Sequence, residues 1–157
     1  MKRRRRPDLV VGWREWVLVD GIGCEAPVKA KIDTGAATSA LHAPLLQVFE
    51  RHGSPWATFT FRPHQRGSRD SMRVEVPIVD ERRVRSSNGV TELRPVAETS
   101  ITIGDQSWTV QFTLTRRDTM GFRMLLGRHA LRGRAVVDVS RSFAAGPPTT
   151  PDRHGPS

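Results

Sequence analysis

Short stretches of alternating apolar and polar residues dominate this chain and predict β-strands. Side chains of successive strand residues point to opposite faces, so a period of two indicates strands with one buried face. Five such stretches, rich in β-branched residues, lie at residues 15–20, 26–33, 73–80, 91–104 and 107–117. The dipeptides Asp20-Gly21, Asn88-Gly89 and Gly104-Asp105 between them are typical of tight turns. The pattern predicts an all-β domain with mainly antiparallel strands.

Two short helices are expected beside these strands. One is predicted from about Pro44 to His52, and the other over residues 128–133, RHALRG. Gly133 suits a helix C-terminus, because glycine readily adopts the positive φ that ends many helices. No internal repeat is long enough to supply two halves of one site. The predicted fold class is therefore all-β with one or two short helices.

Composition divides the chain into a body and two tails. Residues 1–8 form a basic tail, and residues 144–157 are rich in proline and poor in apolar residues, so both are expected to be disordered. Residues 9–143 form the predicted domain, and the 157-residue chain is long enough to bury a core without disulfide or metal. The single cysteine, Cys24, is expected to be a small side chain beside a turn.

The positive charge is concentrated at the N-terminus. Five of the nine net positive charges belong to residues 2–6, and four remain for everything after them. The other arginines are not interleaved with stacking aromatic residues, so no dedicated nucleic-acid function is expected. The basic N-terminus lacks the apolar segment of a secretory signal, and no run approaches 18 apolar residues. We therefore expect a cytoplasmic protein that does not enter the membrane.

The stretch KAKIDTGAATSALHA, residues 29–43, places one carboxylate at the end of a predicted strand. Asp33 is followed by Thr34 and Gly35, and a glycine there lets backbone N–H groups approach the carboxylate. An aspartate that opens a turn is also common for purely structural reasons. The tripeptide alone leaves both interpretations open.

A second motif lies about ninety residues downstream. In FRMLLGRHALRG, residues 122–133, three apolar residues precede Gly127. A glycine after buried strand positions often marks a place where another backbone segment passes closely. The alternative is a core strand that simply ends in a turn.

Together these motifs resemble the retropepsin-type aspartic peptidases. More closely, VGWREWVLV, KAKIDTGAATSALHA, VRSSNGVTELRPV and RDTMGFRMLLGRHALRG resemble the bacterial RimB-like family, long labelled ATP-dependent zinc proteases. The resemblance extends from about Val11 to Phe143. It implies a retropepsin-like half-barrel that hydrolyses peptide bonds.

The resemblance also implies a homodimer. Aspartic peptidases use two carboxylates and the chain has one Asp-Thr-Gly, so Asp33 is expected to face the Asp33 of a second copy. Thr34 is expected to hydrogen-bond across the dimer, Gly35 to supply a backbone donor, and Ala36 to leave room for substrate. The family pattern has arginine where this chain has Ala37, which puts an anion-binding role of that position in doubt.

A flap and a basic cleft are expected around the turn. The hairpin VRSSNGVTE, residues 84–92, and the loop at residues 62–72 are the two candidates for the flap. Forked guanidinium donors suit carboxylate-rich peptides such as glutamate tails added by a RimK-type ligase, which the resemblance implies as a partner. The arginines expected to bind substrate are Arg82, Arg83, Arg85, Arg94 and Arg128.

No metal or nucleotide site is predicted. The chain lacks a His-Glu-x-x-His motif and a phosphate-binding Gly-x-x-x-x-Gly-Lys loop, and its histidines are scattered. We therefore expect no cofactor, and His42 is expected to support the active-site turn. All four tryptophans are expected to pack in the core. The alternative to a peptidase is a non-catalytic module of the same fold that binds acidic peptides.

Overall fold

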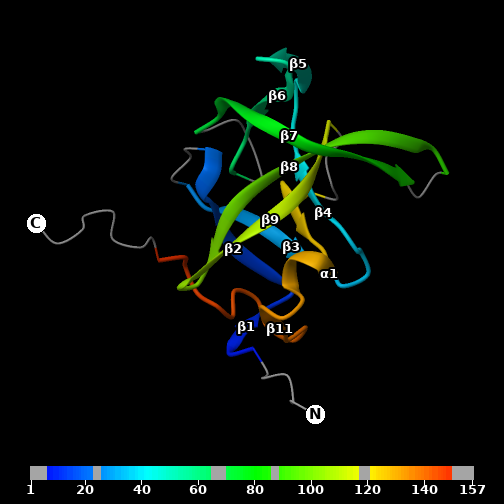
Figure 1. Cartoon of the computed structure of the whole chain (residues 1–157). Coiled ribbons are helices and arrows are strands. Elements are labelled where there is room, and N and C mark those ends of the chain that lie inside the picture. The colour runs from blue at the N-terminus through cyan, green and yellow to red at the C-terminus, as the bar shows by residue number, and fades with distance from the viewer. Residues whose placement is uncertain (1–6, 23–25, 65–69, 86–88, 117–120, 150–157) are drawn as a thin grey trace, which may run out of the picture.

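The structure is a computed structural model and describes residues 7–22, 26–64, 70–85, 89–116 and 121–149. In these ranges strands dominate, with one short α-helix and one 3-10 helix (Figure 1). The strands are β1 (Leu9–Val11), β2 (Arg14–Val19), β3 (Val28–Ile32), β4 (Ser39–His42), β5 (Gln47–Arg51), β6 (Ser54–Phe61), β7 (Met72–Arg85), β8 (Thr91–Ile103), β9 (Gln106–Thr115), β10 (Met124–Leu126) and β11 (Ala135–Val137). The helices are η1 (Asp20–Ile22) and α1 (Arg128–Leu131).

Nine strands form one sheet, and part of it closes into a ring. Its order is β2-β3-β10-β4-β9-β8-β7-β6-β5, and β2 also pairs with β8, which closes the first six strands. The pairs β3–β10 and β4–β9 are parallel, and the other pairs of this sheet are antiparallel. Outside the ring, β1 and β11 form a parallel pair. The predicted all-β, mainly antiparallel fold is confirmed.

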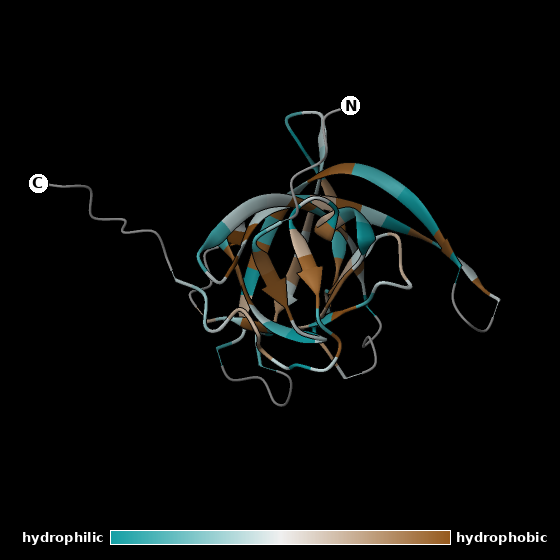
Figure 2. Cartoon of the chain, turned by 90° about the horizontal axis from the view of Figure 1, so that it is seen from below, coloured by the Kyte–Doolittle hydropathy of each residue, from teal (hydrophilic) through white to brown (hydrophobic). Residues whose placement is uncertain are grey.

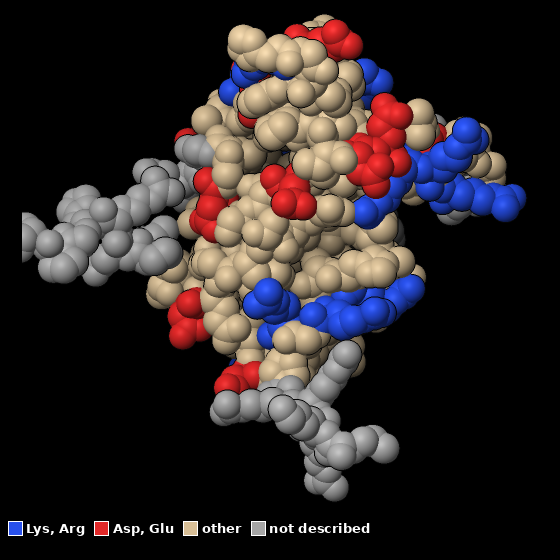
Figure 3. All heavy atoms as spheres, in the orientation of Figure 1, with Lys and Arg blue, Asp and Glu red and all other residues tan. Residues whose placement is uncertain are grey.

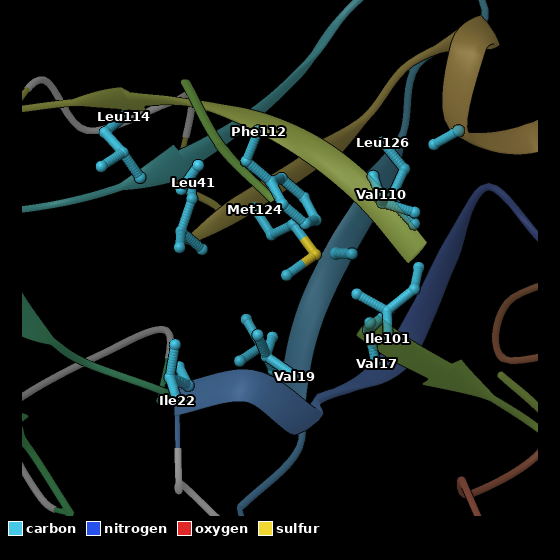
Figure 4. Packing of buried hydrophobic residues seen from close by; sticks show 14 of the residues in the cluster. Val17, Val19, Ile22, Leu41, Ile101, Val110, Phe112, Leu114, Met124 and Leu126 are labelled. Carbon is cyan, nitrogen blue, oxygen red and sulfur yellow. The ribbon is translucent and has the colours of Figure 1, made fainter. Parts of the chain in front are cut away.

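The core fills the interior of this ring. Alternation along the strands turns the apolar side chains inward, and Val17, Ile101, Phe112, Met124 and Leu126 are all almost fully buried (Figure 4). Figure 2 shows hydrophobic residues gathered on the strands of the body, while much of the projecting β7–β8 hairpin is hydrophilic. Among the described residues, no helix is long and apolar enough to cross a membrane.

The five predicted strands are present as β2, β3, β7, β8 and β9. Gly104-Asp105 forms the two-residue turn between β8 and β9, as predicted, with Ile103 opposite Gln106. Asp20-Gly21 instead belongs to η1, where the Gly21 N–H donates to Thr99 Oγ1 at 3.0 Å. Cys24, Asn88 and residues 65–69 of the 62–72 loop lie outside the described residues.

The helix predicted from Pro44 to His52 is wrong. Residues 47–51 form β5, which pairs with β6 so that Phe49 lies opposite Trp56. His52 and Gly53 both have positive φ, 50° and 79°, which suits the two-residue turn joining twisted antiparallel strands. Pairing with β6 therefore decides the conformation of this stretch, because cross-strand contacts outweigh its weak helical pattern. The second predicted helix is present as α1, and Gly133 has the positive φ, 73°, expected after it.

The chain remains bound to the sheet beyond residue 143, where the sequence predicts that the body ends. The Phe143 N–H donates to the Arg14 carbonyl at 2.9 Å, and the Thr149 N–H donates to the Gly104 carbonyl at 2.8 Å. The buried Glu15 carboxylate accepts the Ala145 N–H at 3.1 Å and the Gly12 N–H at 3.4 Å. We call residues 138–149 the C-terminal strap.

Burial raises the pKa of Glu15, and the two backbone donors only partly oppose this effect. A carboxyl whose pKa is raised in the folded state contributes stability below its unfolded pKa of 4.5 and loses it as the pH rises through the folded-state pKa. The unfolding temperature of Glu15→Gln, measured relative to that of wild type, is therefore expected to increase as the pH is raised from 4 to 8. Thermal unfolding of both proteins across this range measures the difference. A constant difference would contradict the prediction.

Candidate active site

The candidate site is built where β10 lies between β3 and β4. β10 pairs with β3 through Leu126 opposite Ile32, and with β4 through Leu125 opposite Ala40. The chain leaving β3 must therefore cross the end of β10 to reach β4. Residues 33–38 make this crossing, which begins with the Asp33 N–H donating to the Leu126 carbonyl at 2.8 Å.

The Asp33 carboxylate is fixed by the turn that follows it. The Gly35 N–H donates to Asp33 Oδ1 at 3.1 Å, and the Ala36 N–H donates to the Asp33 carbonyl at 3.2 Å. Asp33 is half-buried, whereas Thr34 and Gly35 are exposed. A Cβ at Gly35 would lie 3.3 Å from Oδ1, so glycine allows this close approach. The site thus presents one oriented carboxylate beside two exposed residues.

Gly127 is the point where the two motifs touch. A Cβ there would lie 2.6 Å from the Thr38 carbonyl oxygen and 2.8 Å from that of Ala36. The Gly127 N–H donates to the buried Ser39 Oγ at 3.0 Å. The prediction that another backbone segment passes closely at this glycine is confirmed. The Asp33 turn and the downstream motif therefore form one packed unit.

The helix α1 continues this contact. The Arg128 and His129 N–H groups donate to the Ala36 and Ala37 carbonyls at 2.8 and 3.0 Å, so the turn satisfies donors that a helix start leaves unpaired. Arg128 Nη1 also donates to the Thr34 carbonyl at 2.9 Å. One of the five predicted arginines thus lies directly at the Asp33 turn.

A second predicted arginine, Arg82, lines a hollow of about 540 Å³ next to the turn. Its Nη2 donates to Gln111 Oε1 at 2.5 Å, and Gln111 Nε2 donates to Glu98 Oε2 at 3.2 Å. The hollow is lined by Thr38, Ser39, Arg82, Glu98, Thr109, Val110, Gln111, His129 and Ala130. Arg82 is therefore close to the turn, but its guanidinium group already contacts Gln111 and, through Nε at 3.7 Å, Asp80 Oδ2.

Like Arg82, the other three predicted arginines lie on the outer part of the β7–β8 hairpin, where residues 80–85 pair with residues 91–96. We call this part the arm. Arg83 lies opposite Leu93 and Arg85 opposite Thr91, while Arg94 Nε donates to Glu92 Oε2 at 3.1 Å. The arm projects from the ring on the same side of Figure 1 as the loop between β3 and β4. Lys and Arg side chains gather along it in Figure 3. These three arginines do not contact the Asp33 turn.

His42 does not support the Asp33 turn as expected, and Ser39, which does, was not predicted. His42 lies at the far end of β4 from the turn, where its Nδ1 is 3.2 Å from Arg123 Nη1. Ser39 was not predicted to be a site residue. Its Oγ accepts the Gly127 N–H, and its carbonyl oxygen accepts the Thr113 hydroxyl. A serine at the start of a buried strand was the available signal, because a buried hydroxyl usually has a partner.

Within the described ranges, no three His, Cys, Asp or Glu side chains gather closely enough to hold a metal ion. The donors around the turn are instead backbone N–H groups and arginine guanidinium groups. Such donors suit anionic groups. The candidate site thus presents the Asp33 carboxylate beside the guanidinium group of Arg128.

Comparison with known proteins gives relatives of two kinds. The chain is 42% identical over 137 residues to a probable alpha-L-glutamate ligase of Shewanella pealeana, and 42% identical over 138 residues to one of Parasynechococcus marenigrum. These matches cover 87% and 88% of this chain. They span only 30% and 29% of the two ligases. The similarity thus concerns one region of much longer proteins.

A crystal structure of a Legionella pneumophila protein of unknown function has a similar fold. The TM-score is 0.71 at 26% sequence identity, and the match covers 88% of this chain and 98% of the other. Residues 10–148 match the RimB-like family, described as retropepsin-like aspartic endopeptidase RimB. With most of its length matched, the chain belongs to this family of retropepsin-like aspartic endopeptidases.

Proposed function

We propose that the chain is an aspartic endopeptidase whose two catalytic carboxylates come from two copies of the chain. The observation that carries the proposal is the Asp33 turn, in which the carboxylate is oriented by the Gly35 N–H and the loop is supported by Gly127. The sequence contains Asp-Thr-Gly once, and in this proposal a second copy supplies the other carboxylate. A twofold axis beside the exposed Thr34 and Gly35 would bring two such turns together.

In the proposed mechanism the two carboxylates share one proton. Two like charges a few ångströms apart cannot both ionise, so one group stays protonated and the pair titrates as a unit. The ionised carboxylate accepts a proton from water, which attacks the scissile carbonyl carbon. The protonated carboxyl donates to the carbonyl oxygen as negative charge develops there. Breakdown of the tetrahedral species transfers a proton to the leaving amine and releases two peptides.

Other residues of the turn have supporting roles in this proposal. The exposed Thr34 forms no side-chain hydrogen bond within the described residues, so its hydroxyl is available to the partner copy. Gly35 keeps its N–H on the carboxylate, and Ala36 offers space for substrate. The arm is the proposed flap, because it projects on the same side as the turn in Figure 1. Closing it would exclude water from the carboxylate pair.

The proposed substrates are peptides rich in glutamate. Two observations support this class: arginines lie at the turn and along the arm, and the relatives of known name are probable glutamate ligases. A peptidase that cleaves glutamate tails would act on the product of such a ligase. We therefore also propose a RimK-type glutamate ligase as a functional partner.

A second candidate function is a module that binds glutamate tails without cleaving them. It is favoured by the fact that the matching region forms about 30% of proteins named as ligases. In such a protein a binding module would hold the growing tail near the ligase site. This function needs the arginines but not the ionised Asp33.

Dilution and chelation test the shared site. If two copies complete the site, hydrolysis of an oligoglutamate peptide per mole of chain is expected to fall as the protein is diluted below its dimer dissociation constant. Release of new amino termini measures the rate, and sedimentation measures the dimer at each concentration. EDTA is expected to leave the rate unchanged. A rate that stays proportional to concentration while the protein becomes monomeric would contradict the proposal.

A further inference from the structure

Arg14 at the start of β2 is held between two aromatic rings. Its guanidinium carbon lies 4.7 Å from the centre of the Trp13 ring and 5.0 Å from the centre of the Phe143 ring. Its Nε donates to Ser142 Oγ at 3.2 Å. Cation–π contacts of this kind stabilise the guanidinium and limit its motion. The Arg14 head group is therefore ordered before any ligand binds.

The C-terminal strap builds this aromatic clamp. The Trp13 N–H donates to the Arg141 carbonyl at 2.9 Å, and Phe143 stacks on Trp16 with ring centres 5.1 Å apart. Phe143 has a φ of 56°, a conformation that non-glycine residues adopt only when their surroundings enforce it. In the strap, the strained backbone at Phe143 thus accompanies the placement of its ring against Arg14.

Arg14 has no carboxylate partner among the described residues, where its one hydrogen bond from the side chain runs from Nε to Ser142 Oγ. Arg51 offers a direct comparison, because it also lies over two rings, those of Trp56 and Phe49. The Arg51 Nη2, however, contacts Glu75 Oε2 at 2.5 Å. The positive charge of Arg51 is thus neutralised within the protein, whereas that of Arg14 is not. The terminal donors of Arg14 suit an external carboxylate.

The position of Arg14 connects this charge to the Asp33 turn. Arg14 lies opposite Lys31 in the β2–β3 pair, and the Ile32 N–H donates to the Trp13 carbonyl at 2.9 Å. Lys29 and Lys31 alternate with buried residues on β3, so they point outward. Asp33 follows directly after the end of this strand. A row of cations therefore leads along the outer face of β2 and β3 to the candidate catalytic carboxylate.

We propose that Arg14 is a specificity-determining residue that binds the side-chain carboxylate of a glutamate near the scissile bond. This inference rests on the proposed function and names a subsite within it. Lys31 adds positive charge beside the guanidinium. Trp13, with 36% of its surface exposed, offers an apolar wall for the glutamate methylene groups. Of the four tryptophans expected to pack in the core, only Trp108 belongs to it, while Trp16 and Trp56 are half-buried. Trp13 is exposed, and this subsite gives its exposure a role.

Peptide binding in a cleavage-deficient background tests the subsite without relying on turnover. Asp33→Asn protein is mixed with a dye-labelled oligoglutamate peptide or its glutamine counterpart, and fluorescence anisotropy gives each Kd. Adding Arg14→Gln is expected to raise the Kd for the glutamate peptide about tenfold, the cost of one charge-assisted hydrogen-bonded pair. The Kd for the glutamine peptide is expected to change little. Arg14→Lys should fall between wild type and Arg14→Gln, because it keeps the charge but loses the fork.

Arg51→Gln is the matched control, since it also removes an arginine from an aromatic pair but lies on β5. It is expected to leave both Kd values unchanged. Thermal unfolding of each variant separates a lost subsite from a lost fold. Equal losses for the glutamate and glutamine peptides, or no loss for either, would overturn the inference. The proposed function fails on a different result, hydrolysis that survives Asp33→Asn, so the two failures are distinguishable.

Discussion

Asp33→Asn is expected to lower the rate of oligoglutamate hydrolysis about 10³-fold or more, because asparagine cannot accept the proton of the attacking water. The substitution is nearly isosteric, and an amide oxygen at this position can still accept the Gly35 N–H that Oδ1 now holds at 3.1 Å. The fold and the peptide affinity should therefore be retained. Rates from released amino termini and affinities from anisotropy measure the two effects separately.

Asp138→Asn provides the matched control for this substitution. Its Oδ1 accepts the Ser140 N–H at 3.0 Å, two residues ahead, as Asp33 Oδ1 accepts the Gly35 N–H. It therefore tests the same change in the same kind of turn, away from the proposed catalytic pair. Its hydrolysis rate is expected to stay far above that of Asp33→Asn. If Asp33→Asn hydrolyses peptide as fast as this control, the carboxylate-pair mechanism is excluded and the binding module becomes the better account.

Gly127→Ala is expected to destabilise the folded protein by about 3 kcal/mol, at the upper end of the cost of overpacking. A Cβ at this position would meet three backbone atoms of Ala36 and Thr38 within 2.8 Å, and backbone cannot move aside as a flexible side chain can. Relief of the clash must displace the 33–38 loop or the start of α1. Hydrolysis is therefore expected to fall even where the variant remains folded. Urea unfolding and the peptide assay measure the two losses.

Gly133→Ala distinguishes this clash from a general intolerance of alanine. Gly133 has a φ of 73°, and a Cβ there would meet nothing within 4 Å. The strained φ alone should cost about 1 to 2 kcal/mol, with the hydrolysis rate preserved. Should the two variants be equally stable and equally active, the close crossing at Gly127 would not be what supports the site.

The strands were predictable because their signal is local. Alternation identified β2, β3, β7, β8 and β9, and a two-residue turn at Gly104-Asp105 needs only its own sequence. The stretch at residues 47–51 was not predictable in this way. Its conformation depends on pairing with β6, where buried Ala57, Phe59 and Phe61 alternate with threonines. This strand signal in β6 was missed, and so the partner of residues 47–51 was missed with it.

The site was predictable in parts. Asp33 and Gly127 each stand in a recognisable motif, and their contact follows from the known family resemblance as well as from the structure. Arg14 could not be predicted, since its partners Trp13, Ser142 and Phe143 come from opposite ends of the chain and meet only after the strap folds back. Five arginines were selected from the sequence, and among the described contacts only Arg128 donates a hydrogen bond to the turn. The charge of a residue does not indicate where in the fold its side chain lies.

The insertion of β10 between β3 and β4 also governs when the site can form during synthesis. The facing edges of β3 and β4 lack their neighbour until residues 124–126 have left the ribosome, although residues 28–42 emerged long before. Contacts so distant in sequence form slowly, because the intervening loop must close first. A growing or truncated chain that ends before β10 therefore contains the Asp33 turn without the strand that supports it. The candidate site is therefore complete only when nearly the whole domain has been made.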